Sequence, residues 1–570
     1  MAVFSFLRAA YLAVISRIAF GSTVTAQGLD ALEECPRTDN SIYDYIVVGS
    51  GAGGGPVAAR LAENGFSVLV VETGVDQRNN INTTTLALSW TAIDDPTIDL
   101  NYTINEYPPD FPIQRNDLWY PRASAIGGCT IHNAMENGIG GLRQTFDNLA
   151  RMFNDSSWTR DNMQSFYALL ERNLYLNAPN PDHDPQWEAI ATSVIDVSGP
   201  VIEDVNSHHP LPNFGRGLTS WTADTNFRRS SIRDRLGQVA ANSDKLTIMT
   251  NTLATKVLLC KSAKDVVAYG VSVAPGAKLP IAQGFRGKQK LNETRIIAKR
   301  EVIVSAGVFQ SPQLLMLSGI GDSAQLHKFG IPSIVHRPGV GSNLQDNDEV
   351  PAFWELKQNF TDPVPFGEAF STSAHSTSLE PDIDTYFVSD QWPGFVHGLS
   401  VIAADTPNFI TIVNLKALSS SKGYVRLTGS HPQDLLDINK LRFQAPGGQQ
   451  DIAALREGVK RWREVMNTPA IQKFVKKEVL PGANVTSDED LDNYILERVF
   501  AHHACCTNHI GPDDDPQAVL DGDFNVRGVQ NLRVVDISSW PEIPGYYPTS
   551  PTYLIAEKAA QVILRDAKRG

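Results

Sequence analysis

The segment from Tyr43 to Glu72 restricts the fold more than any other part of this sequence. It begins with YDYIVV (43–48), a short apolar run rich in β-branched residues that predicts a buried strand. A helix is expected next, ending at Gly65, and FSVLVVE (66–72) predicts a second buried strand. Between the first strand and the helix lie three glycines in G-x-G-x-x-G spacing, Gly49, Gly51 and Gly54. This order of elements predicts a βαβ unit of a doubly wound sheet.

The residue types in this unit suit a dinucleotide. Gly49 permits a tight turn, Gly51 lets the backbone approach a pyrophosphate, and Gly54 lets the helix pack closely on the strand. The helix N-terminus offers free N–H groups to the phosphates, and Glu72 can accept a hydrogen bond from a ribose hydroxyl. A glycine motif alone would also fit a plain tight turn, but here the two strands, the helix and the terminal acid are all present in the expected order. The acid favours FAD or NAD over NADP.

Length and charge limit the remaining choices. A chain of 570 residues exceeds what one hydrophobic core usually organises, so two domains or one elaborated domain are expected. The net charge of −14, without a basic run, argues against a nucleic-acid partner. Further strands are predicted at 244–260, 266–275, 294–307 and 532–538, the first three as a meander that returns to the main sheet, and a helix is predicted at 551–567.

A second domain is expected between about 350 and 500. Aromatic residues and prolines rise there, and the runs 408–416 and 423–429 predict a separate antiparallel sheet. The aromatic residues of this region fit either a substrate pocket or an ordinary core, and include Phe353, Trp354, Phe366, Phe387, Trp392 and Phe395.

The stretch AHHACCTNHIG (501–511) concentrates histidines and cysteines. Zinc needs three or four converging ligands, whereas neighbouring residues of an extended segment point in opposite directions, so no metal is expected. A disulfide between Cys505 and Cys506 is a strained, less favoured alternative. His502 and His509 are expected to be packed or solvent-facing histidines.

Four motifs, in this order, resemble those of the glucose–methanol–choline (GMC) family of FAD-dependent oxidoreductases over about residues 43–565. The sequence is most similar to fungal members of the family. The four motifs are the glycine motif with Glu72, PRASAIGGCTIHNAM (121–135), GVFQSPQLLMLSGIG (307–321) followed by PGVGSNLQD (338–346), and HACCTNHIG with NLRVVDISSWPEIP and PTYLIAEKAA. The resemblance implies an α/β fold: a doubly wound, Rossmann-like FAD-binding domain and a smaller α+β substrate domain on an antiparallel sheet. The FAD domain would comprise 40–155, 226–348 and 499–570, the last with the active site, and the substrate domain 156–225 and 349–498.

The resemblance also implies a reaction. A base takes the hydroxyl proton of a small-molecule alcohol, hydride passes to flavin N5, and oxygen or another acceptor then takes the electrons. His503 begins the family's histidine motif and is the candidate base; an imidazole titrates near neutrality, so no large pKa shift is required. Tyr547 stands where the family has a second His or Asn, as an orienting donor or a pocket wall. His132 stands where some relatives bond FAD covalently, and the alternative is a histidine that packs beside the flavin.

The remaining cofactor contacts expected from the resemblance are Ser50, Ala52, Gly128, Asn133, Met135, Ala254, Asp536 and Pro548, besides Gly49, Gly51, Gly54, Glu72, His132 and Tyr547. The departures at Tyr547 and at Asn347, where the family often has His, keep a second function open. This is a cyclase or dehydratase without net redox change on the same flavin fold. The leading expectation is an FAD-dependent alcohol oxidase or dehydrogenase in fungal secondary metabolism.

The N-terminus (1–26) predicts a cleaved secretory signal with Val24-Thr25-Ala26 before the cut, against a membrane anchor or amphipathic leader. Six Asn-x-Ser/Thr sequons fit a secreted glycoprotein: Asn82, Asn101, Asn154, Asn292, Asn359 and Asn484. Five cysteines are too few for a disulfide scaffold. The sequence does not indicate the oligomeric state.

Overall fold

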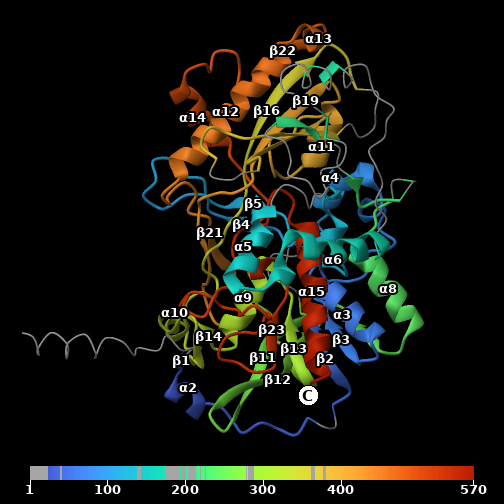
Figure 1. Cartoon of the computed structure of the whole chain (residues 1–570), viewed down its shortest axis with the longest axis vertical. Coiled ribbons are helices and arrows are strands. Elements are labelled where there is room, and N and C mark those ends of the chain that lie inside the picture. Colours follow the sequence, from blue (N-terminus) through green and yellow to red (C-terminus); the bar gives the residue numbers. More distant parts are fainter. Residues whose placement is uncertain are drawn as a thin grey trace, which may run out of the picture.

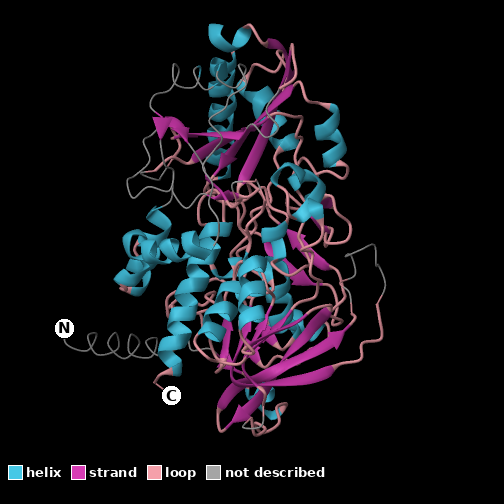
Figure 2. Cartoon of the chain, turned by 90° about the vertical axis from the view of Figure 1, so that its right-hand side faces the viewer, coloured by secondary structure: helices cyan, strands magenta, loops and turns pink. Residues whose placement is uncertain are grey.

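A computed structural model describes residues 23–569 except for short internal stretches (Figures 1 and 2). The stretches left out are 39–40, 138–142, 174–188, 191–192, 194–200, 203–213, 218–219, 225, 227, 278, 280–287, 361–365 and 377–379. Figure 2 shows two sheets, in magenta, towards opposite ends of the molecule, with loops between them. Most of the predicted signal segment lies outside the described residues.

The first sheet is built from the predicted βαβ unit. Its strand order is β10–β3–β2–β13–β12–β11, with β23 paired to β13, and β10, β3, β2, β13 and β23 run parallel. The bounds are β2 Tyr43–Val48, β3 Val68–Val71, β10 Leu246–Met249, β11 Thr252–Ser262, β12 Asp265–Pro275, β13 Thr294–Val304 and β23 Leu532–Val534. The centre of this parallel sheet is apolar and buried on both faces, as a covered parallel sheet requires; it comprises residues 45–48, 68–71 and 302–304.

Helices pack beside this sheet and position its glycine turn. Helix α3 (Gly54–Glu63) follows β2 and contacts both α8 (Ile232–Asn242) and α15 (Thr549–Ala567). Figure 1 shows α3 in blue, α8 in green and α15 in red. A Cβ on Gly54 would lie 2.1 Å from the carbonyl oxygen of Gly49, so only glycine allows this approach of helix and strand.

The second sheet forms the other end of the molecule. Its order is β22–β16–β19–β18–β17–β8–β7, antiparallel except for β7 and β8. The bounds are β7 Val201–Ile202, β8 Phe214–Gly217, β16 Asp348–Leu356, β17 Phe366–Ser371, β18 Ile383–Val388, β19 Phe409–Lys416 and β22 Val475–Leu480. Helix α12 (Gly448–Met466) packs on β16, β18 and β19 and contacts α14 (Asp488–Arg498). The predicted fold class is thus confirmed.

Two strand predictions need correction. The run 244–260 is not one strand: a left-handed Asn251 separates β10, in the parallel part, from β11, in the meander. The run 423–429 contains β20 (Tyr424–Leu427), which pairs with β21 (Leu436–Asn439) in a hairpin of their own and not with the substrate sheet. Propensity identified both runs as extended, but strand partners depend on tertiary packing.

The N-terminal end of the described chain is attached to the first domain. Strand β1 (Thr23–Val24) pairs with Val335–His336, and helix α2 (Ala26–Asp30) is capped by Thr25. A disulfide joins Cys35 to Cys260 of β11. Among the described residues, no helix has both the length and the apolar character needed to cross a bilayer.

Candidate active site

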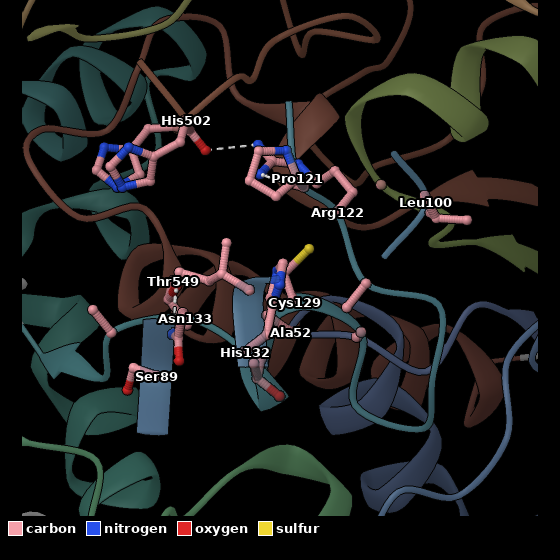
Figure 3. Close-up of a pocket in the computed structure, with 18 of the residues that line it drawn as sticks. Ala52, Ser89, Leu100, Pro121, Arg122, Cys129, His132, Asn133, His502 and Thr549 are labelled. Atoms are coloured by element: carbon pink, nitrogen blue, oxygen red, sulfur yellow. Dashed lines mark hydrogen bonds between the residues drawn. The ribbon is translucent and has the colours of Figure 1, made fainter. Parts of the chain in front are cut away.

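A cavity of about 670 Å³ lies between the two sheets, where the glycine turn faces the histidine segment. Figure 3 shows His502 and Arg122 at one side of the view and His132, Asn133 and Thr549 at the other. The predicted cofactor contacts that line it are Gly49, Ser50, Gly51, Ala52, Glu72, Gly128, His132, Asn133, Ala254, Asp536, Tyr547 and Pro548. Gly54 and Met135 do not: Gly54 packs α3 on β2, and Met135 is buried against Leu86 and Ala223. The structure therefore places Met135 behind the cavity wall.

The glycine turn leaves room for an extended ligand. The Cβ positions of Gly51 and Gly128 face each other across the two turns, and a Cβ on Gly128 would come 3.1 Å from the Cα of Gly51. Glu72 is buried at the end of β3, where it accepts hydrogen bonds from Ser50 Oγ at 2.6 Å and Gly74 N at 2.9 Å. Glycine at both positions lets these two turns approach closely beside the cavity, and a glycine turn at the N-terminus of a helix fits the pyrophosphate of FAD.

His132 borders the same cavity and is neutral. Burial, with the nearby Arg122 and Arg229, lowers the pKa of His132 to about 3. Its Nδ1 is buried without a hydrogen-bond partner in the described part of the chain. Arg229 holds the neighbouring Asn133 through its side-chain oxygen at 2.5 Å and its carbonyl at 2.7 Å. A neutral imidazole is the form that can act as a nucleophile.

His503 is held in one tautomer by Asn347. Its Nδ1 lies 2.7 Å from Asn347 Oδ1. The Asn347 amide nitrogen donates to the carbonyls of Lys416, Ala417 and Gly545 at 3.2, 2.8 and 3.0 Å, so the amide oxygen must face His503. Nδ1 therefore carries the hydrogen, and Nε2 is the unprotonated nitrogen, without a partner among the described residues. Sequence reasoning noted Asn347 only as a departure from the family.

Burial changes the titration of this base. The largest effect on His503 is desolvation, followed by His502, and together they lower its pKa to about 3. The expectation that no large shift is needed was wrong, because sequence alone does not show burial. The His503 backbone N–H donates to Asp346 Oδ1 at 2.8 Å, and Asp346 in turn accepts from Tyr120 and pairs with Lys440 at 2.9 Å.

His502 lies beside His503, contrary to the expectation from an extended segment. The ring centroids are 3.8 Å apart, and His502 lines the cavity. The segment is not a strand here, and Cys506 has a φ of 77°, so alternation does not apply. Arg122, also missed at the sequence level, donates to the His502 carbonyl at 2.7 Å (Figure 3).

Glu349 lies behind the two histidines. One of its carboxylate oxygens and the two ring nitrogens lie within 4.8 Å of one another, a spacing also found in metal sites. However, Asn347 already engages Nδ1 of His503, and Tyr386 donates to Glu349 Oε2 at 2.5 Å. We therefore describe these side chains as a close cluster, in which His503 and Glu349 are hydrogen-bonded to other residues, and not as metal ligands.

Tyr547 lines the cavity near His503, with the two rings perpendicular and their centroids 5.9 Å apart. Its hydroxyl donates to Asp384 Oδ2 at 2.8 Å. Burial raises the pKa of Asp384 to about 8, and burial also raises that of Tyr547 well above its usual value. While this hydrogen bond persists, the Tyr547 proton is directed to Asp384 and not to the cavity.

The other histidine and cysteines of the cluster lie outside the cavity wall. His509 Nε2 lies 3.3 Å from Asp515 Oδ2, which agrees with a packed histidine. Cys505 and Cys506 form a disulfide between neighbouring residues, the alternative that the sequence disfavoured. Cys129 is a free thiol at the cavity wall (Figure 3).

The site combines a Rossmann-like sheet, a glycine turn with an acid after the second strand, and a histidine across the cavity. These features fit a flavin-dependent oxidoreductase. Family models described as GMC oxidoreductase match residues 43–349 and 419–556. The chain belongs to the GMC oxidoreductase family, and it is an FAD-dependent alcohol oxidase or dehydrogenase.

Similar proteins match nearly end to end. Oxidoreductase cicC of Emericella nidulans is 29% identical, with 93% of this chain and 95% of that protein covered. Pyranose dehydrogenase of Agaricus campestris is 28% identical, with 92% and 94% covered. The crystal structure of pyridoxine 4-oxidase from Mesorbium loti shares the fold, with a TM-score of 0.77 at 22% identity over 91% of this chain and 98% of that one.

Proposed function

We propose that this enzyme oxidises an aromatic or polyketide-like alcohol, with His503 as the general base, in fungal secondary metabolism. The observation that carries the mechanism is the Asn347–His503 hydrogen bond, which leaves Nε2 as the basic nitrogen of a cavity-lining imidazole. The similarity to proteins of Emericella nidulans and Agaricus campestris supports a fungal setting.

The chain's own residues carry out the acid–base part of the reaction. His503 takes the hydroxyl proton on Nε2 as the alcohol O–H bond breaks, and Asn347 Oδ1 keeps Nδ1–H in place throughout. Bound FAD, held by the glycine cradle and Glu72, supplies the acceptor for hydride from the carbinol carbon. Tyr547 walls the pocket, and it becomes a donor to the substrate oxygen when Asp384 is protonated and reverses their hydrogen bond.

An aromatic wall supports the substrate class. Trp90 and Trp392 have ring centroids 5.0 Å apart, Trp392 and Phe395 5.6 Å, and Phe395 and His502 4.6 Å. All of them line the cavity, so a flat aromatic ring would stack here close to the base. Other residues from the predicted aromatic set are ordinary core: Phe353, Trp354 and Phe387 are buried away from the cavity.

The test is an anaerobic panel of aromatic, aliphatic, sugar and choline-type alcohols, with loss of the oxidised-flavin absorbance as the readout. We expect aromatic alcohols to bleach the flavin fastest and His503→Gln to slow bleaching by about 10²–10⁴-fold, the usual contribution of a positioned base. Sugars as the fastest donors would refute the substrate class. A loss below tenfold in His503→Gln would refute the base. Product formation with unchanged flavin colour would instead support the cyclase or dehydratase.

We also propose that FAD is bonded covalently through His132. Its support is the neutral, buried imidazole at the cavity wall described above. A histidyl link would hold the isoalloxazine in place and raise its potential.

Entry into the secretory pathway is a further proposal. The Cys35–Cys260 disulfide supports it, because such bonds persist in oxidising compartments. A cut after Ala26 would remove β1 and the Thr25 cap of α2, so we place signal cleavage before Thr23. N-terminal sequencing of the secreted protein tests the cleavage position, and a mature chain that begins after Ala26 would refute cleavage before Thr23.

A further inference from the structure

Glu349 is a buried carboxyl that the mechanism above does not use. It belongs to β16, is fully buried and does not line the cavity. Its Oε1 lies 3.1 Å from Nδ1 of His502 and 3.8 Å from Nδ1 of His503. Its backbone N–H and carbonyl both pair with Phe500, at 3.0 and 2.9 Å. The carboxyl and the histidine segment are therefore held at a fixed distance.

Glu349 is the acid best placed to balance a positive charge on His503. When His503 takes a proton, a cation forms in a buried site, which costs free energy unless an anion is near. Asp346 is the other nearby acid, but Lys440 and Tyr120 already engage it. The salt-bridge partners of Glu349 among the described residues are the two histidines.

We propose that Glu349 is a positioning residue whose carboxylate stabilises the proton that His503 takes from the alcohol, so that its ionisation sets the acidic limb of the pH–rate profile. The proposal rests on His503 as the base. In the step, the alcohol O–H bond breaks and the Nε2–H bond of His503 forms. Glu349 stays ionised and exchanges no proton, and bound FAD would accept the hydride from the carbinol carbon.

The titration behaviour agrees with this geometry. Burial raises the pKa of Glu349 to about 7, against the opposing effects of His503 and of the Tyr386 hydrogen bond. The pKa of His503 lies at about 3, so the base is already unprotonated in the neutral range. A limb near pH 7 then includes the ionisation of Glu349: as pH rises, the carboxylate forms and kcat/KM increases.

Other titratable groups face Glu349 from each neighbouring element. They are His502 and His503, Tyr386 and Asp384 of β18, Asp346, Lys440 and Glu136. Burial raises the pKa values of Glu136 and Asp384 to about 7 and about 8, so the wild-type limb contains contributions from several carboxyls. A variant at Glu349 itself is needed to separate them.

The first experiment needs no substrate. Holoenzyme labelled with ¹⁵N-histidine is titrated by NMR between pH 5 and 9 (about the range in which the carboxyls titrate), in wild type and in Glu349→Gln. Glutamine keeps the shape and can still accept from Tyr386. We expect the ring signals of His502 and His503 to shift near pH 7 in wild type and to lose that inflection in Glu349→Gln. Asp382→Asn, a buried carboxyl on the same domain that bonds Ser373 and Lys416, should keep it.

The second experiment measures kcat/KM against pH with the fastest alcohol of the panel. Glu349→Gln should lower kcat/KM by about 10–100-fold, as loss of a group supporting a functional side chain typically does, with a flattened limb. Tyr386→Phe, which removes a hydrogen bond to the carboxylate, should move the limb to higher pH. The proposal is overturned if folded, FAD-loaded Glu349→Gln shows the same acidic limb as wild type. If Glu349→Gln does not fold, an acidic limb that stays in place in Tyr386→Phe overturns it instead. The His503→Gln variant separates the role of the base from the role of Glu349. If this variant keeps its turnover, the assignment of His503 as the base is wrong, independently of the results for Glu349.

Discussion

Replacement of Asn347 by leucine tests whether the Asn347–His503 hydrogen bond fixes the tautomer of the His503 ring. Asn347 is fully buried, its oxygen faces Nδ1 of His503, and its nitrogen donates to three backbone carbonyls. Leucine has the same branched shape, although it is larger, and it neither donates nor accepts a hydrogen bond. The amide has two N–H donors, which the three carbonyls share, and its oxygen bonds His503. With about 1 kcal/mol for each of these three hydrogen bonds, we expect the free energy of unfolding to fall by about 3 kcal/mol.

The catalytic effect has a separate cause. Without the acceptor, the hydrogen of His503 can move to Nε2, and the ring loses the base nitrogen in a fraction of molecules. We expect flavin reduction by the best alcohol to slow by about 10–100-fold, the usual cost of losing an orienting partner. Anaerobic stopped-flow absorbance gives this rate, and FAD content and thermal unfolding show whether the variant is intact.

A matched control distinguishes orientation from general damage. Asn414 is also fully buried in the second sheet and accepts from Thr385 at 3.0 Å; within the described part of the chain, no hydrogen bond joins it to His502 or His503. Asn414→Leu should lose stability but reduce its flavin at nearly the wild-type rate. The reasoning is wrong if folded, FAD-loaded Asn347→Leu stays within threefold of wild type, or if both variants slow equally.

Three further predictions follow from other parts of the structure. Acid-precipitated wild type should keep its yellow colour in the pellet and His132→Ala should release it; colour released from both would exclude the covalent link. Cys260→Ser should lower the free energy of unfolding by about 2–4 kcal/mol in chemical denaturation, because the bond to Cys35 closes a loop spanning 225 positions, and an unchanged midpoint would contradict this. Burial raises the pKa values of the carboxyls near the cavity, so their stabilising effect is present below pH about 4 and is lost as pH rises through their folded values. Calorimetry should therefore show the melting temperature falling from pH about 6.5 to about 8, and a rise there would refute it; the carboxyls are Glu136, Glu349 and Asp384, at about 7, 7 and 8.

The sequence by itself determined the first domain and named the candidate base. The βαβ unit depends on local signals, namely β-branched runs, glycine spacing and a terminal acid, and these act over about 30 residues whatever the rest of the chain does. The order of the motifs was enough to predict the family, FAD and His503. The same local rules predicted strands in the second domain, although not the partners of 423–429.

Tertiary structure alone decided how the active site works. Asn347, Glu349 and Arg122 come from segments far from His503 in sequence, and no periodicity or spacing indicates that they meet it. Burial lowers the pKa of His503 to about 3, and a hydrogen bond joins Tyr547 to Asp384. The His502 and His503 rings lie side by side because the segment is irregular and not extended. Desolvation and long-range hydrogen bonding are properties of packed atoms, so they appear only when the chain has folded.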